Sequence, residues 1–263
     1  MNTQLEKAII IKNEPWTPEY HLLEFAAPGI SQQAAPGQFV HMKIPDRRDI
    51  LLRRPFSIFK ANSETLSILY KSVGSGTRHM AQLLTGQTVN LMGPLGKGFP
   101  VPDTNKKTLL VAGGYGMAAL YLTAARAQAP GLLFAGGASK KDILCAQDFV
   151  ELGWDVRLAT EDGSCGMRGL VTTILDAWQS RHKESFEPEL FACGPTGMLK
   201  AVAHRAKEWN CTAWISLDHY MACGMGACLA CVQKINRDGE ERLACTCKEG
   251  PVFEAREIIW EES

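Results

Sequence analysis

The stretch TLLVAGGYGMAA, residues 108–119, carries the clearest indication of a fold in this sequence. An uninterrupted apolar run leads into Gly113, Gly114 and Gly116, and an alanine-rich segment with helical character follows as far as residue 128. The motif Gly114-x-Gly116-x-x-Ala119 formally matches the dinucleotide fingerprint, in which glycines let a pyrophosphate approach a helix N-terminus. The stretch therefore predicts the strand, phosphate-binding turn and helix of a Rossmann-like unit.

The sequence around this unit continues the alternation of strands and helices. Apolar strands are expected at residues 131–137, 154–160 and 189–194, and helices at 148–152, 170–180 and 198–210. Such alternation predicts a parallel, doubly wound sheet. Cys193-Gly194-Pro195 ends one strand at the carboxyl edge, where open α/β sheets bind ligands. No acidic residue follows the strand at 131–137 to contact a ribose, and NADH and NADPH remain alternatives.

The preceding hundred residues have a different pattern. Short apolar runs such as HLLEF, LSILYK and TVNLMG recur about every ten residues, and the intervals between them are rich in glycine and proline. This spacing indicates an antiparallel β-barrel or sandwich. A single helical insert is expected at residues 76–84.

Two segments in this first region suit a flavin dinucleotide. In Arg54-Pro55-Phe56-Ser57 the guanidinium can bind a pyrophosphate, the aromatic ring can stack and the hydroxyl can donate a hydrogen bond. Gly76 and Thr77 open the expected helix, where free backbone N–H groups attract phosphate. The alternatives are a solvated pair of arginines at a barrel rim and a plain hairpin turn.

The C-terminal region is rich in cysteine. Cys223-x4-Cys228-x2-Cys231, with a further thiol at Cys245 or Cys247, matches the plant-type pattern that holds a [2Fe–2S] cluster. The residues between the first three cysteines are mostly Gly and Ala, which let backbone amides approach the cluster. The alternatives are a structural zinc site and buried thiols without a metal.

Composition excludes several functional classes. The 263 residues contain 28 Lys or Arg and 28 Asp or Glu, and this balance argues against a nucleic-acid partner. There is no apolar run of 18 residues to span a membrane, and the N-terminus does not read as a secretory signal. An odd number of cysteines, nine, without such a signal predicts reduced thiols and a cytoplasmic location.

Together these motifs resemble the ferredoxin–NADP reductase superfamily. With MACGMGACLAC and CKEGPVF, the whole sequence is similar to the electron-transfer subunits of the NAD-dependent dihydroorotate dehydrogenases of the B type. The resemblance implies a multi-domain protein of α+β and α/β class. It would contain an antiparallel β-barrel that binds FAD in residues 1–102, a Rossmann-like parallel sheet that binds NAD in residues 103–212, and a small [2Fe–2S] module in residues 213–263.

The resemblance also assigns residues to cofactors. FAD would be held by Arg54, Pro55, Phe56, Ser57, Leu69, Tyr70, Lys71, Gly76 and Thr77, and the pyridine nucleotide by Gly113, Gly114, Gly116, Met117, Cys193, Gly194 and Pro195. The cluster ligands would be Cys223, Cys228, Cys231 and Cys247, since the family's last ligand directly precedes a segment like CKEGPVF. The family's Gly-Gly-Gly-Ile-Gly-x-x-Pro turn is replaced here by residues 112–119, which carry Tyr115 and lack the proline.

The implied function is an electron relay. A separate catalytic subunit with FMN oxidises dihydroorotate; the cluster takes electrons from that FMN, FAD collects two, and NAD⁺ is reduced. The resemblance implies a heterotetramer of two plus two subunits and no catalytic acid or base on this chain. Residues 221–229 and 253–260 are candidates for docking the partner, with core packing as the alternative. Competing functions are a ferredoxin:NAD(P) or sulfide-type flavin reductase subunit and, among non-enzymes, a zinc-module adaptor.

Overall fold

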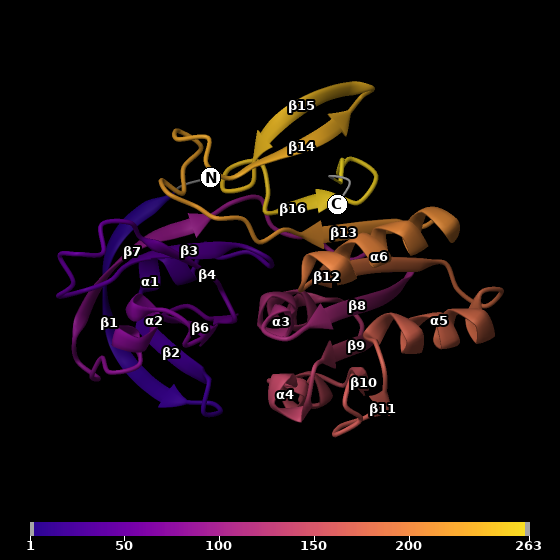
Figure 1. Cartoon of the computed structure of the whole chain (residues 1–263), viewed down its shortest axis with the longest axis horizontal. Coiled ribbons are helices and arrows are strands. Elements are labelled where there is room, and N and C mark those ends of the chain that lie inside the picture. Colours follow the sequence, from indigo (N-terminus) through magenta and orange to yellow (C-terminus); the bar gives the residue numbers. More distant parts are fainter. Residues whose placement is uncertain (1–2, 261–263) are drawn as a thin grey trace.

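The computed structural model describes residues 3–260, which form a curled antiparallel sheet beside a parallel one, with a small hairpin above both (Figure 1). The curled sheet has the strand order β4-β3-β7-β1-β2-β6-β5. Its strands are β1 (Gln4–Pro15), β2 (Tyr20–Ala26), β3 (Phe39–Lys43), β4 (Arg54–Ser57), β5 (Lys60–Ala61), β6 (Thr65–Lys71) and β7 (Thr88–Leu95). The order runs from β4 to β5 without pairing them, so the sheet is a half-barrel.

The half-barrel encloses its own apolar core. Along β1, Ala8 and Ile10 are fully buried, whereas Ile9 between them is 47% exposed, as period-2 alternation requires. Helix α1 (Pro28–Ser31) packs beside β1, and α2 (Ser75–Met80) follows β6. The second helix ends before the expected residue 84. The side-chain amide of Asn13 donates to the carbonyls of Met80 and Leu83 and satisfies the C-terminal groups there.

The second sheet has the order β11-β10-β9-β8-β12-β13-β16. It consists of β8 (Lys107–Gly113), β9 (Leu132–Gly137), β10 (Asp155–Thr160), β11 (Met167–Arg168), β12 (Pro188–Cys193), β13 (Thr212–Ser216) and β16 (Val252–Glu254). All neighbouring pairs are parallel except β13 with β16. The parallel sheet expected from the sequence is therefore present, extended by one antiparallel edge strand.

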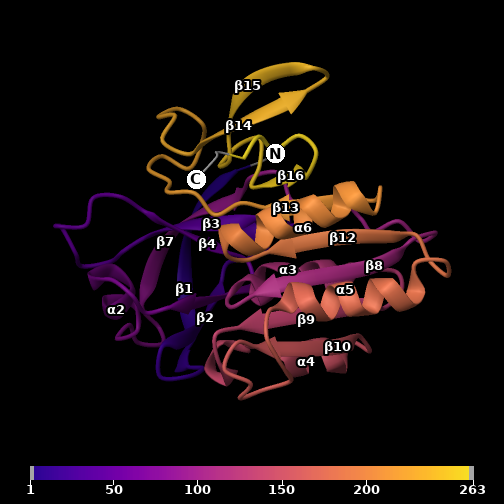
Figure 2. The same cartoon turned by 45° about the vertical axis from the view of Figure 1, so that its right-hand side comes forward.

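Helices cover both faces of this sheet (Figure 2). Helices α3 (Gly116–Arg126) and α4 (Ala146–Glu151) share one apolar cluster, and α5 (Val171–His182) and α6 (Thr196–Glu208) pack into another. A short 3₁₀ turn, η1 (Lys140–Asp142), follows β9. Among residues 3–260, no helix is long and apolar enough to cross a membrane.

The C-terminal region is shared between the central sheet and a separate hairpin. Strands β14 (Val232–Arg237) and β15 (Glu240–Cys245) form a two-stranded sheet of their own. Strands β13 and β16, by contrast, belong to the central sheet, and the expected boundary at residue 213 falls inside β13. The cysteine segment is thus held at both ends by the central sheet.

Three apolar side chains of the tail at residues 253–260 lie in the core. Phe253, Ala255 and Ile258 are buried in the cluster that also contains Leu190 and Trp178. The alternative of core packing is therefore correct for this segment, because antiparallel pairing of β16 turns its apolar side chains under α6 and the β14–β15 hairpin. Met225 and Leu229, in the other candidate segment, are 56% and 63% exposed.

We predict that Phe253→Ala lowers the free energy of unfolding by about 3–5 kcal/mol, because it removes a fully buried aromatic ring from this core. Leu243→Ala, at a side chain that is 64% exposed, serves as the control and should change it by less than about 0.5 kcal/mol. Urea unfolding followed by circular dichroism measures both. Equal effects of the two substitutions would contradict the placement of the tail in the core.

Candidate functional site

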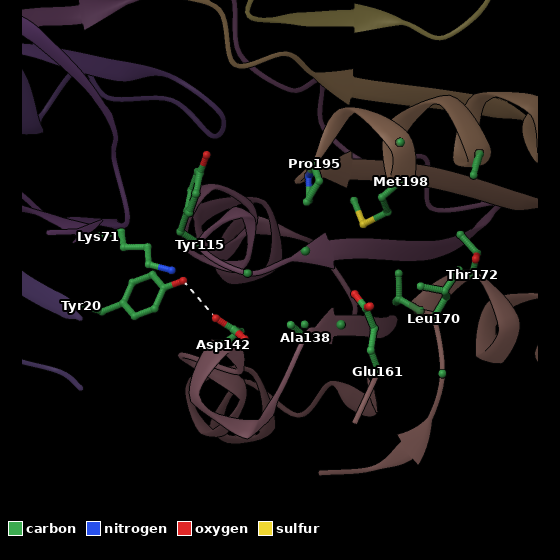
Figure 3. A pocket seen from close by; sticks show the side chains of 18 residues that line it. Tyr20, Lys71, Tyr115, Ala138, Asp142, Glu161, Leu170, Thr172, Pro195 and Met198 are labelled. Carbon is green, nitrogen blue, oxygen red and sulfur yellow. Dashed lines mark hydrogen bonds between the residues drawn. The ribbon is translucent and has the colours of Figure 1, made fainter. Parts of the chain in front are cut away.

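A cavity of about 570 Å³ lies at the carboxyl edge of the central sheet (Figure 3). Its walls include the backbone of Gly113 and Gly114 at the end of β8 and of Gly136 and Gly137 at the end of β9. We call it the dinucleotide cavity. The remaining lining residues are Tyr20, Lys71, Tyr115, Ala138, Asp142, Glu161, Gly169, Leu170, Val171, Thr172, Pro195, Gly197, Met198 and Ala201.

The glycines after β8 are required by close packing against the turn that follows β12. A Cβ on Gly113 would lie 2.5 Å from Cδ of Pro195, and one on Gly116 would overlap the carbonyl of Cys193. Gly114 has a φ of 54°, in the left-handed region that favours glycine. This arrangement brings the two loop ends together and exposes backbone at the sheet edge, as phosphate binding requires.

The sequence-predicted nucleotide residues have four different surroundings. Gly113, Gly114 and Pro195 line the dinucleotide cavity, and Cys193 lines the neighbouring cavity described next. Gly194 lines a third cavity, of about 340 Å³, beside Pro195. Gly116 and Met117 line none of these; Met117 is fully buried in the core under α3.

A second cavity, of about 310 Å³, lies where the half-barrel, the central sheet and the cysteine segment meet. We call it the flavin cavity. Seven of the predicted FAD residues line it: Pro55, Phe56, Ser57, Leu69, Tyr70, Lys71 and Thr77. The other lining residues are Phe39, Val73, Tyr115, Cys193, Ser216, Leu217, Asp218, Met221 and Pro251.

The wall of the flavin cavity is mainly apolar but contains an unpaired polar atom. The rings of Phe56 and Tyr70 lie 5.7 Å apart, and Tyr70 is 3% exposed. Within residues 3–260 its hydroxyl has no hydrogen-bond partner, and burial raises its pKa, so the group stays protonated. A buried donor without a partner is costly, and a ligand with polar atoms in this cavity would satisfy it.

Arg54 and Gly76 take different positions from the other predicted FAD residues. The Arg54 guanidinium donates to the carbonyl of Leu52 at 3.0 Å and does not line the flavin cavity. Gly76 is buried beneath Ile44 and Ile50. Thr77 does line the cavity, and its hydroxyl oxygen accepts hydrogen bonds from the N–H groups of residues 73 and 74.

Backbone amides converge on two of the predicted cluster sulfurs. Sγ of Cys223 accepts from the N–H groups of Met225, Ala227 and Cys228 at 3.3–3.4 Å, and Sγ of Cys247 accepts from Gly226 at 3.1 Å. Burial raises the pKa of Cys223, but these amides outweigh it and lower that pKa to about 6. The loop is therefore organised for a thiolate, the form that binds metal.

Two positions of the same loop have no room for a side chain and are occupied by glycine. Gly224 and Gly226 both have positive φ, and added Cβ atoms would press on the His41 ring and on Cδ of Lys248. Burial and then the neighbouring Cys231 raise the pKa of Cys247 to about 12, which indicates that these two thiols lie close together. Small residues, converging amides and paired thiols fit an iron–sulfur cluster that these cysteines would hold as thiolates. Over residues 3–260, no three of the His, Cys, Asp and Glu side chains could hold a single metal ion.

Cys245 and Cys247 differ in how their sulfurs are contacted. Cys247 receives the Gly226 N–H, whereas the Cys245 thiol faces the Gly226 carbonyl at 4.0 Å. An amide donor favours a thiolate and a carbonyl favours a protonated thiol. Burial and Cys231 raise the pKa of Cys247, but of these two sulfurs it is the one that a backbone amide contacts, and this contact supports the expectation that Cys247 is the fourth ligand.

We predict that Cys247→Ser removes most of the bound iron, whereas the matched variant Cys245→Ser retains it, because only the first loses a sulfur that receives a backbone amide. Iron and acid-labile sulfide, measured per flavin on anaerobically purified protein, separate the two. Retention of iron by Cys247→Ser together with its loss from Cys245→Ser would reverse the assignment.

Sequence reasoning missed several residues of the two cavities. Tyr20 Oη donates to Asp142 at 3.4 Å across the gap between the half-barrel and the central sheet, and Tyr115 Oη donates to Asp218 at 3.0 Å. These partners are 122 and 103 positions apart, so no local motif could reveal them. Glu161 and Asp218 do follow strands at the carboxyl edge, which was the available signal.

A half-barrel with a cavity at the carboxyl edge of a doubly wound sheet defines the ferredoxin-reductase-like fold. A chain in the structure of the NADH-dependent reduced ferredoxin–NADP oxidoreductase, reported for flavin-based electron bifurcation, superposes with a TM-score of 0.84 and 27% identity over 97% of this chain and 90% of that one. The ferredoxin NADP⁺ reductase of Neisseria gonorrhoeae with bound FAD and NADP gives 0.63 and 16% identity, covering 78% and 91% of the two chains.

Sequence comparison narrows this class to one family. The family model of the iron–sulfur cluster binding domain of dihydroorotate dehydrogenase B matches residues 218–259. The dihydroorotate dehydrogenase B (NAD(+)) electron transfer subunit of Desulforamulus reducens is 36% identical, over 93% of this chain and 94% of that protein, and that of Shouchella clausii is 37% identical over 88% of each. The chain belongs to the family of these electron transfer subunits, which confirms the resemblance.

Proposed function

We propose that this chain carries electrons from the FMN of a dihydroorotate dehydrogenase catalytic subunit, through a [2Fe–2S] cluster and FAD, to NAD⁺. One observation carries the proposal: the flavin cavity lies between the other two sites. It includes Met221 of the cysteine segment on one side and shares Lys71 and Tyr115 with the dinucleotide cavity on the other. The order of the sites along the molecule is thus the order of the relay.

The chain's residues would hold each cofactor by simple contacts. The β4 and β6 residues of the flavin cavity, with the unpaired Tyr70 hydroxyl, would bind FAD. The glycine turns after β8 and β9, with Pro195 at the start of α6, would receive NAD⁺. Cys223, Cys228, Cys231 and Cys247 would ligate the cluster. When bound, FAD links one-electron transfer by the cluster to two-electron transfer by nicotinamide.

Each cofactor is assigned to one region of the chain. We assign FAD binding to the region 1–102, NAD binding to the region 103–212 and the cluster to the region 213–263; the parallel and curled sheets support this assignment, and β13 and β16 tie the last region to the central sheet. We place the protein in the cytoplasm, since cysteines that are to ligate a cluster as thiolates suit a reducing compartment. The assembly is two of these chains with two catalytic subunits.

Cofactor analysis with and without the partner tests the relay. We expect purified protein to contain flavin, iron and acid-labile sulfide, and to show visible absorption from both cofactors. Oxidation of dihydroorotate coupled to NAD⁺ reduction should require the FMN subunit, because the proposal assigns that oxidation to the partner. Iron-free protein, or equal dihydroorotate:NAD⁺ activity without the partner, would contradict the proposal.

The same purified protein also distinguishes the proposed relay from two alternative functions. The high similarity to the reduced ferredoxin–NADP oxidoreductase chain favours, as second candidate, a ferredoxin:NAD(P) reductase subunit. That function would give faster flavin reduction by ferredoxin than by the FMN subunit with dihydroorotate. A zinc-module adaptor would be colourless, and the match of residues 218–259 to an iron–sulfur cluster binding domain argues against it.

The exposed tip of the cysteine loop is the proposed docking surface for the FMN subunit. Met225 and Leu229 present apolar side chains there, beside the sulfurs that must exchange electrons with the partner. We predict that Met225→Asp and Leu229→Asp each weaken the complex at least about tenfold, because a carboxylate would be desolvated in the interface.

Titration of one subunit into the other measures this effect. Leu84→Asp is the matched control, since Leu84 is 68% exposed and lies at the end of the α2 turn, in the half-barrel. Unchanged affinity of the two loop variants, with intact iron content, would exclude this surface from the interface.

A further inference from the structure

The flavin cavity and the dinucleotide cavity have two residues in common, Lys71 and Tyr115. These side chains therefore form the boundary between them. Figure 3 shows the Tyr115 ring standing up from the glycine turn, with its hydroxyl directed away from Asp142 and Glu161 across the cavity. A group that passes from one cavity to the other at this shared wall passes the ring and the lysine.

The two boundary residues are held from opposite sides. Lys71 forms an ion pair with Glu19 at 2.9 Å and lies over the Tyr20 ring, so it is retained by the half-barrel. Tyr115 donates its hydroxyl to Asp218 Oδ2 at 3.0 Å. Asp218 follows β13 and leads into the cysteine loop. Tyr115 is thus fastened to the segment that carries the cluster ligands.

Tyr115 has the freedom to leave this position. Its side chain is 47% exposed, and it stands between two glycines, Gly114 and Gly116. An added Cβ on Gly114 would meet no atom within 4 Å, so there is open space beside the turn. The ring is held at the boundary between the two cavities by packing and by one polar contact, the hydrogen bond from its hydroxyl to Asp218.

Hydride transfer requires the nicotinamide to approach the flavin closely, and the Tyr115 ring stands in the way of that approach. The nicotinamide carbon that accepts the hydride and the flavin ring nitrogen that gives it up must approach to about 3–3.5 Å, so the nicotinamide must leave the dinucleotide cavity and enter the flavin cavity. The adenosine and pyrophosphate parts of the same molecule need only the glycine turns, on the near side of Tyr115. The Tyr115 ring therefore obstructs binding of the nicotinamide half of the dinucleotide and leaves binding of the adenosine and pyrophosphate half unaffected.

We infer that Tyr115 is a gate, which in its hydrogen bond to Asp218 fills the passage that the nicotinamide ring must enter. This inference rests on the proposed function. NAD⁺ binds in full only to molecules in which the tyrosine has swung away, so its apparent affinity is reduced by the fraction of open molecules. Tyr115 acts as a positioning residue that selects when the nicotinamide meets the flavin.

Calorimetric titration of the FAD-loaded protein with NAD⁺ and, separately, with ADP-ribose tests the gate. Tyr115→Phe keeps the ring and removes the tether, and should tighten NAD⁺ binding by about tenfold, the effect of one hydrogen bond to a carboxylate. Tyr115→Ala removes the ring and should tighten it further. ADP-ribose, which lacks the nicotinamide, should bind equally to wild type and both variants. Tyr220→Phe, at a side chain that is 97% exposed, is the control and should change neither ligand.

The paired ligands separate the possible failures. If NAD⁺ affinity is unchanged in both variants, or if NAD⁺ and ADP-ribose shift together, Tyr115 shapes the turn and is no gate. If ADP-ribose fails to bind any of the proteins, the dinucleotide assignment of the cavity falls and the gate with it. If ADP-ribose binds normally while the relay with the FMN subunit is absent, the proposed function fails and the gate stands.

Discussion

The parallel pairing of β8, β9, β12 and β13 is the constraint on which both cavities depend. The register places Gly113 beside Gly136, Ala112 beside Cys193, and Cys193 beside Ser216. Parallel strands must all end at the same edge, so four turns that are far apart in the chain open toward one space. Glycine at Gly113 and Gly116 then lets the turn after β12 close on the turn after β8. Without this register the turns would remain unrelated loops.

The flavin cavity follows from a second constraint, the packing of the half-barrel against that edge. Its lining comes from three parts of the chain, and none of them encloses the space alone. Trp16 donates to the carbonyl of Leu144, and Lys60 pairs with Asp148, so polar contacts join the half-barrel to the central domain beside the apolar cluster around Phe59 and Tyr121. Burial of aromatic area stabilises the contact, and the directed polar pairs fix its orientation.

Local sequence predicted those features whose cause is local. The glycine turn after β8, the spacing of Cys223, Cys228 and Cys231, and the strand–helix alternation each depend on neighbouring residues, and the elements lie close to where the pattern predicted them. The contacts that complete the site join distant residues, as Tyr115 and Asp218 do. The tail around Phe253 was ambiguous for the same reason: an apolar strand reads alike whether its partner is another subunit or β13 of its own sheet.

The cysteine segment also has a topological property that bears on how such proteins arise. It leaves the central sheet after Ser216 and returns at Val252, and these two residues are direct neighbours across β13 and β16. Residues 217–251 therefore form a closed excursion from one edge of the sheet, with entrance and exit side by side. An ancestral reductase could acquire or discard such a segment at its sheet edge without rethreading the rest of the chain. The same segment also supplies Leu217, Asp218, Met221 and Pro251 to the wall of the flavin cavity, so its exchange would alter the flavin site as well as the cysteine loop.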